Sequence, residues 1–184
     1  MRNAETRGSS SSQAWTWPAT LALVTILGTL ASACMTPYIA LAVVAAATMS
    51  RRHAVCTIGG VWLTAQMLGF TMLHYPTSAY AFAWGAALGI AALAAMSAAS
   101  RIVGRDRPSL SRLLAAFALS FVVYEGLLLG FAYVAGGLET FAPSVVLQIA
   151  SNDGVWLAVL AMLHMVLTSS APRWFGPAPA PRLA

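Results

Sequence analysis

Long apolar runs with almost no charge dominate this sequence, and they limit what the chain can fold into. Of its 184 residues, 59% are hydrophobic and 8% are charged, whereas about a quarter of the residues are charged in an average soluble domain. So few charges cannot cover the surface of a water-soluble globule, and so high a hydrophobicity excludes intrinsic disorder. The composition therefore indicates an integral membrane protein.

Six apolar segments are candidates for membrane-spanning helices. About 20 residues at 1.5 Å each cross a hydrocarbon layer of about 30 Å. The candidates cover Trp17–Ala33, the short Tyr38–Met49, Val55–Leu73, Ala79–Ser100, Leu113–Ala135 and Pro143–Thr168. Residues 1–15 are expected to form a disordered cytoplasmic tail, and the Pro-rich residues 169–184 a second tail. We therefore predict an all-α integral membrane bundle of six transmembrane helices over residues 16–168.

The positions of the basic residues predict the orientation of this bundle. All ten are arginines, and in a six-span arrangement they fall on one side of the membrane. They are Arg2, Arg7, Arg51, Arg52, Arg101, Arg105, Arg107, Arg112, Arg173 and Arg182. The positive-inside rule then places both termini in the cytoplasm, in a bacterial inner membrane. The net charge of +5 is thereby explained by topology, and a lipid bilayer rather than a nucleic acid is the expected partner.

Polar and aromatic residues inside the predicted spans gather toward the outer half of the membrane. Polar side chains in hydrocarbon are costly, so each is a candidate functional residue. A conducting pore needs polar groups along its whole length, whereas a ligand pocket concentrates them at one end. We therefore expect an outward-facing pocket. The candidate ligand-binding residues are Gln66, Trp84, Glu125, Gln148, Asn152, Asp153 and Trp156, with His74, Tyr75 and Tyr80 at a gate.

The two acidic residues within the spans leave several interpretations open. Neither Glu125 nor Asp153 has a basic partner in any span. They could be neutral carboxylic acids bonded to each other, to Asn152 or to Tyr124, or one of them could bind a cationic or amine-bearing ligand. Proton coupling is a further interpretation. Alternatively, Asp153 and Gly154 mark a break in the last helix.

Motifs for catalysis, metal binding and nucleotide binding are missing from the 184 residues. No P-loop, Gly-x-Ser-x-Gly or His-Glu-x-x-His pattern is present. His53, His74 and His164 fall at three different depths and cannot meet at one metal ion. We therefore expect neither an enzyme nor a resident cofactor or metal. The small-residue pair Gly85-xxx-Gly89 predicts close helix packing, either within the bundle or against another membrane subunit.

The organisation of the chain resembles a known family of membrane proteins. The segments that carry the resemblance are Pro37–Ala42, Trp62–Phe70, Tyr75-Pro76, Trp84-Gly85 and Glu139–Pro143, together with Asn152. With six spans and a short second helix, they look like the substrate-binding S-component of energy-coupling factor vitamin transporters. The resemblance is one of architecture and loose motifs over residues 16–168. It implies capture of a vitamin from outside, with a transmembrane coupling subunit and ATPases as partners.

Two functions from different classes follow from these observations. The first is binding and uptake of a small-molecule substrate such as a vitamin or a related micronutrient, without an ATPase in this chain. The alternative is a structural or assembly subunit of a membrane complex that transports nothing, in which the same polar residues only hold helices together.

Overall fold

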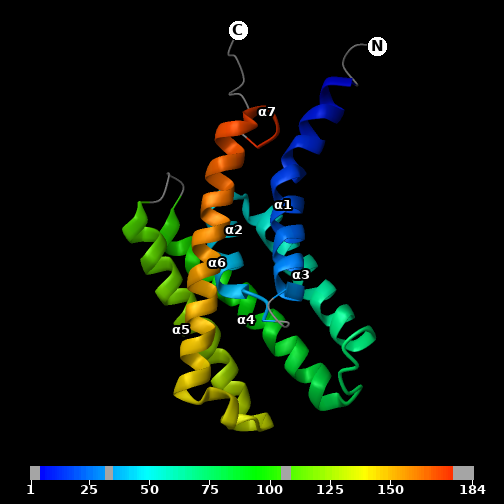
Figure 1. The fold of residues 1–184 in the computed structure, drawn as a ribbon, viewed down its shortest axis with the longest axis vertical. Coiled ribbons are helices and arrows are strands. Elements are labelled where there is room, and N and C mark those ends of the chain that lie inside the picture. The colour runs from blue at the N-terminus through cyan, green and yellow to red at the C-terminus, as the bar shows by residue number, and fades with distance from the viewer. Residues whose placement is uncertain (1–4, 32–34, 105–108, 176–184) are drawn as a thin grey trace.

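The computed structural model describes residues 5–31, 35–104 and 109–175, and all secondary structure in these ranges is helical. The helices are α1 (Glu5–Ala31), α2 (Tyr38–Thr48), α3 (Arg51–Thr71), α4 (Ala79–Val103), α5 (Leu110–Ala135), the 3-10 helix η1 (Leu138–Phe141), α6 (Pro143–Ser170) and the short α7 (Pro172–Phe175). Figure 1 shows α1 to α6 running alternately up and down, so that α1 begins and α6 ends at the same end of the bundle.

The all-α prediction is confirmed, and the helix bounds bear on three details of it. Helix α1 begins at Glu5, so much of the expected disordered tail of residues 1–15 is helical; extending an existing helix costs much less than nucleating one. The tail predicted for residues 169–184 begins with the end of α6 and with α7. Helix α6 continues through Asp153 and Gly154 without the break considered above, because a break would leave backbone groups unpaired.

Serine side chains cap the first turns of three helices and fix where they begin. Ser50, Ser78 and Ser109 each accept a hydrogen bond from the backbone N–H three residues later, at 3.4, 3.2 and 3.4 Å. Each bond pairs one of the four N–H groups that a helix leaves free at its start. The turns before α3, α4 and α5 are therefore specified locally by the sequence.

The short helix α2 lies at the centre of the bundle. Its residues Tyr38 to Ala45 are all buried, and it packs against α3, α4, α5 and α6. A helix that is apolar on every side is stable only when it is surrounded. Sequence and position therefore agree: Tyr38–Thr48 contains no charged or strongly polar residue besides Thr48, and the other helices form a wall around it.

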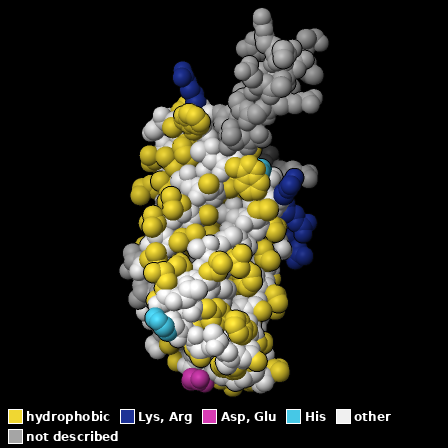
Figure 2. Space-filling model, turned by 90° about the vertical axis from the view of Figure 1, so that its right-hand side faces the viewer, with side chains coloured by type: hydrophobic (Ala, Val, Ile, Leu, Met, Phe, Trp, Pro, Cys, Tyr) yellow, Lys and Arg dark blue, Asp and Glu magenta, His cyan; other side chains and the backbone are white. Residues whose placement is uncertain are grey.

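Four helices, α3 to α6, are long and apolar enough to cross a membrane, and two shorter apolar stretches occupy Ala14–Leu30 and Tyr38–Thr48. Their exposed side chains are largely Leu, Val, Ile and Met, for example Leu63, Ile90, Val122 and Met162. Figure 2 shows a surface rich in hydrophobic side chains, with Arg side chains in the upper part and an acidic one at the bottom. This distribution is that of a multi-pass membrane protein, for which lipid is the solvent of the outer surface.

Glycines on α4 allow α3 to pack closely against it. Trp62 of α3 lies against Gly89, and its Nε1 donates a hydrogen bond of 2.8 Å to the carbonyl oxygen of Gly85. The side chain of Gln66, one turn further along α3, lies directly over Gly85. The Gly85-xxx-Gly89 pair thus serves packing within the bundle, the first of the two uses that the sequence allowed.

Candidate ligand-binding site

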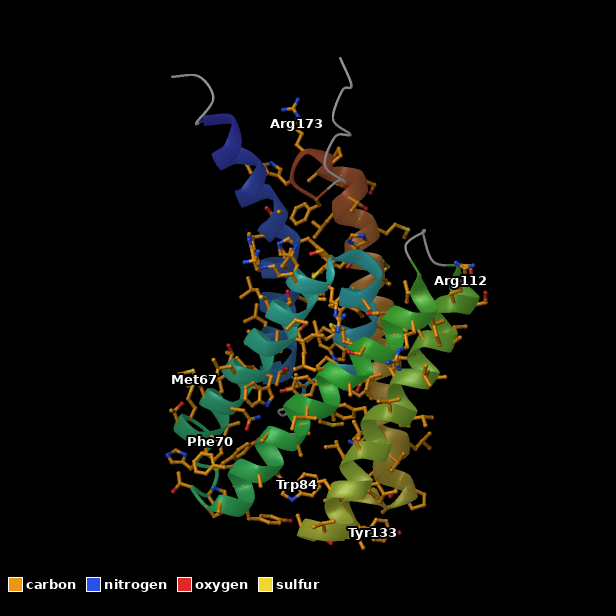
Figure 3. All side chains as sticks on the ribbon, turned by 180° about the vertical axis from the view of Figure 1, so that it is seen from behind. Met67, Phe70, Trp84, Arg112, Tyr133 and Arg173 are labelled. Atoms are coloured by element: carbon orange, nitrogen blue, oxygen red, sulfur yellow. The ribbon has the colours of Figure 1, made fainter. Side chains whose placement is uncertain are left out.

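A cavity of about 430 Å³ lies among α1, α3, α4, α5 and α6, beyond the N-terminal end of α2. It exists because α2 is short. The 11 residues of α2 rise about 16 Å, whereas the 25 residues of α4 rise about 37 Å. The central helix therefore fills only one half of the bundle, which we call the arginine end because Arg112 and Arg173 lie there (Figure 3). We call the space in the other half the α2 cavity.

The α2 cavity brings together most of the residues that the sequence marked as candidates. Those that line it are Gln66, Tyr75, Trp84, Glu125, Gln148, Asn152 and Asp153. They come from four separate helices and from the loop between α3 and α4. The polar and aromatic groups therefore converge on one space of a size typical for small-molecule sites.

Asp153 is held by the start of the central helix. Its Oδ1 accepts a hydrogen bond of 2.8 Å from the backbone N–H of Ala40, and its side chain is buried. The residue at the N-cap of α2 is Pro37, which offers no side-chain cap. Asp153 of α6 therefore supplies the missing cap from another helix, where the positive end of the α2 dipole favours a carboxylate. Its first role is to hold the floor of the cavity.

Glu125 differs from Asp153 because nothing in the described residues pairs with it. The side chain borders the cavity and is 9% exposed, and its buried Oε1 has no hydrogen-bond partner among the described residues. A buried acceptor without a partner costs about 1–3 kcal/mol, and more when charged. Such a group in a cavity wall is a candidate ligand contact.

Aromatic rings form the wall and the floor of the α2 cavity. The rings of Tyr38 and Tyr124 lie with centroids 6.2 Å apart, and both residues are buried. Trp84 packs edge-on against Phe131 at 5.0 Å, and Figure 3 shows it near the end of the molecule opposite Arg112 and Arg173. These rings offer flat apolar surfaces and, in the tyrosines, hydroxyl groups to a ligand.

Three amide side chains add donors and acceptors to the cavity. Gln66 lies over Gly85, Gln148 is exposed with its Nε2 at 3.9 Å from the sulfur of Met35, and Asn152 is half-buried. Gln148 and Asn152 share one face of α6, as their spacing predicts. The amides therefore reach from the rim of the cavity to its floor.

Of the three residues proposed as a gate, only Tyr75 lines the cavity. Tyr75 borders the cavity and packs on Gly69. The hydroxyl of Tyr80 donates a hydrogen bond of 3.3 Å to the carbonyl oxygen of Gly136, linking the start of α4 to the end of α5. His74 is exposed and has a positive φ of 55°, the left-handed conformation that non-glycine residues seldom adopt.

Trp156 is not part of the cavity, contrary to the prediction. Its ring packs against Gly28 of α1, so closely that a Cβ at this glycine would overlap it. Each step of four residues rotates a helix position by about 40°, so Trp156 is turned by about 80° from Gln148. This rotation moves the ring from the cavity to the interface with α1. Trp156 is therefore a packing residue.

Several lining residues had not been singled out as ligand contacts. They include Thr29, Thr36, Tyr38, Tyr124, Thr140 and Phe141. Tyr38 could have been found, because a tyrosine at the first position of an otherwise apolar buried helix needs a place for its hydroxyl. The contributions of α1 and η1 follow from how the helices pack and have no local signal in the sequence.

The donor set of the cavity does not favour a metal ion. Among the described residues, no group of three or more His, Cys, Asp or Glu side chains could hold one. Cys34 lies outside the described residues, and Cys56 is free and exposed.

No family model, curated protein or solved structure matches this chain. The properties of the site therefore rest on its own geometry.

Proposed function

We propose that this protein is the membrane-embedded binding component of an uptake system for a vitamin or a related small micronutrient. In this proposal the chain spans the membrane six times, and the two shortest spans are the apolar stretch Ala14–Leu30 of α1 and the helix α2. Both termini and the arginine end face the cytoplasm, so the α2 cavity faces outward. The chain supplies the binding site, and energy for release inward comes from elsewhere.

The observation that carries this proposal is the convergence of polar and aromatic side chains on one cavity, at the end opposite the arginines that the structure describes. A structural bundle of this size has no need of a cavity of about 430 Å³ bordered by Glu125, Asn152 and Gln66. Close packing is the rule in protein interiors, and voids cost stability. A cavity with polar walls is therefore best explained by a ligand.

The proposed partners are a transmembrane coupling subunit and its ATPases, as in the energy-coupling factor transporters that the chain resembles. The lipid-facing surfaces of α3 to α6 are largely apolar, which suits contact with a second membrane protein as well as with lipid. The sequence contains no nucleotide-binding motif. Active uptake by this chain would therefore require such a partner.

The direct test is to purify the protein from cells and to examine it for a bound small molecule by mass spectrometry. We expect a molecule that leaves on denaturation and that is absent from the variant Ala65→Phe, in which a ring fills the α2 cavity. The control is Ala86→Phe, on the neighbouring helix α4, because Ala86 is exposed and does not border the cavity. A folded protein that never carries or binds any molecule contradicts the proposal.

The orientation has its own test. Single cysteines introduced at Thr77 and at Ser109, in a background with both native cysteines replaced, would be labelled in intact cells with a membrane-impermeant maleimide. We expect labelling at position 77 only, with position 109 labelled after permeabilisation. The reverse pattern would place the cavity on the cytoplasmic side and would contradict uptake from outside.

The alternative function, an assembly or structural subunit, is favoured by the hydrogen bonds between helices. Ser120 Oγ donates to the carbonyl oxygen of Ala95 at 3.0 Å, and Trp62 joins α3 to α4. Such bonds contribute roughly 0.6–2 kcal/mol each to helix association. They show that some polar groups serve packing, whereas Glu125 makes no such bond. The ligand experiment therefore distinguishes the two functions.

A further inference from the structure

The charge balance of the α2 cavity restricts the ligands that it can take. No Lys or Arg is among the described residues that line it, whereas two acids, Glu125 and Asp153, are. The arginines that the structure describes in α3, α4, α5 and α7 are exposed. An anionic ligand would therefore place a negative charge beside two acidic side chains in a low-dielectric setting, with no side-chain cation to balance it.

The two acids are not equivalent, and their difference identifies the group that is free to bind. Asp153 already accepts the N–H of Ala40 at the positive end of α2, so this carboxyl group has a partner within the fold. This bond also occupies the helix N-terminus that would otherwise attract an anion. Glu125 is 9% exposed, and its Oε1 has no partner among the described residues. One unmatched carboxylate therefore remains in the wall.

The neighbours of Glu125 fit an organic cation better than a metal ion. A hard metal cation takes about six oxygen ligands, and one of the two carboxylates in the cavity is committed to α2. The adjacent Tyr124 and the facing Tyr38 present aromatic rings with centroids 6.2 Å apart. Aromatic faces attract ammonium and similar groups. A ligand that combines one positive nitrogen with a flat apolar body would match both features.

We infer that the α2 cavity binds a small organic monocation, whose positive N–H group donates to the carboxylate of Glu125 beside the rings of Tyr38 and Tyr124. The inference rests on the proposed function, because it assigns the chemical class of the ligand of that same cavity. It also accounts for the unpaired Glu125, because the ligand supplies the hydrogen-bond donor that is missing among the described residues.

A charge series of probes tests this inference on the full-length protein in lipid nanodiscs at neutral pH. The probes are phenethylamine, 2-phenylethanol and phenylacetate, which share a ring and differ in carrying a positive, zero or negative charge. Thermal unfolding at increasing probe concentration gives each dissociation constant. We expect phenethylamine to bind at least tenfold more tightly than the alcohol, which is about 1.4 kcal/mol, and phenylacetate to bind most weakly.

Variants locate the effect in one side chain. Glu125→Gln should remove the tenfold preference for the amine while leaving the affinity for the alcohol nearly unchanged. Glu139→Gln is the matched control, because Glu139 is exposed in η1 and does not line the cavity, and it should keep the preference. If Glu125→Gln fails to fold, the charge series on the unsubstituted protein still decides whether the cavity prefers a cation.

The remaining outcomes separate this inference from the proposed function. Equal binding of the three probes, or tightest binding of phenylacetate, overturns the assignment of a cation and leaves the cavity as a binding site. A preference that survives Glu125→Gln overturns the role of Glu125. If no probe binds and a neutral or anionic molecule co-purifies, the assignment of a cationic ligand is wrong and the proposed binding function is retained. If no probe binds and no molecule co-purifies, both the assignment and the proposed function are wrong.

Discussion

The two halves of the bundle are built from the same long helices and differ in what lies between them. At the arginine end, α2 fills the centre, and small residues such as Ala92, Ala95 and Ala99 of α4 are completely buried. At the opposite end there is no central helix, and the space between the same walls is the α2 cavity. The length of one short helix therefore decides where the protein is solid and where it is hollow.

The largest expected effect is a difference in stability between two alanine-to-phenylalanine variants, one in the filled half of the bundle and one in the cavity wall. Ala92→Phe should prevent folding or cost at least about 3 kcal/mol, because a fully buried alanine in a packed core has no room for a ring. Ala65→Phe, in the cavity wall, should change the melting temperature little. Unfolding of both variants in detergent would be followed by circular dichroism. Equal destabilisation would show that the cavity is not free space.

A smaller effect is expected at the boundary between the halves. Asp153→Ala removes the acceptor for the Ala40 N–H, and we expect a loss of about 2–3 kcal/mol in the free energy of unfolding. Asp153→Asn keeps an oxygen in the same place and should lose less than half of that. The measurement is the melting temperature of the purified variants. A loss that is the same for Ala and Asn would argue against the capping role.

The smallest effect is expected inside the hollow half. Glu125→Leu replaces an unpaired buried carboxylate by an apolar side chain of similar volume, so the ligand-free protein should gain about 1 kcal/mol in stability. The same substitution should abolish binding of a cationic probe. Melting temperatures with and without the probe give both results. A ligand-free variant less stable than the parent would mean that Glu125 has a structural partner.

Positions along the membrane axis could be predicted from the sequence with good accuracy. The predicted segment Tyr38–Met49 and the helix Tyr38–Thr48 differ by one residue, because Pro37 and Ser50 mark its ends. Counting residues from the loops also placed Gln66 and Trp84 in the same half of the bundle, and both line the cavity there. A rise of 1.5 Å per residue is a fixed property of helices, so depth follows from counting alone.

Directions around each helix axis could not be predicted in the same way. Trp156 was assigned to the cavity and packs on Gly28 instead, and Tyr38 was not recognised as part of the cavity floor. Which way a side chain faces depends on how the helices are arranged around α2, and in lipid no simple apolar stripe marks the inner face. The pairing of Asp153 with Ala40, 113 positions apart in the sequence, is likewise a product of that arrangement.

The bond between Asp153 and the start of α2 has a mechanical consequence. Separating α6 from α2 would leave a carboxylate and helical N–H groups unpaired in hydrocarbon, so these two helices should travel together as a single unit. The floor of the cavity, which is the N-terminal end of α2, then keeps its position relative to α6. Any opening that lets a molecule in or out must come from the walls that are free of this tie, which are α1, α3, α4 and α5.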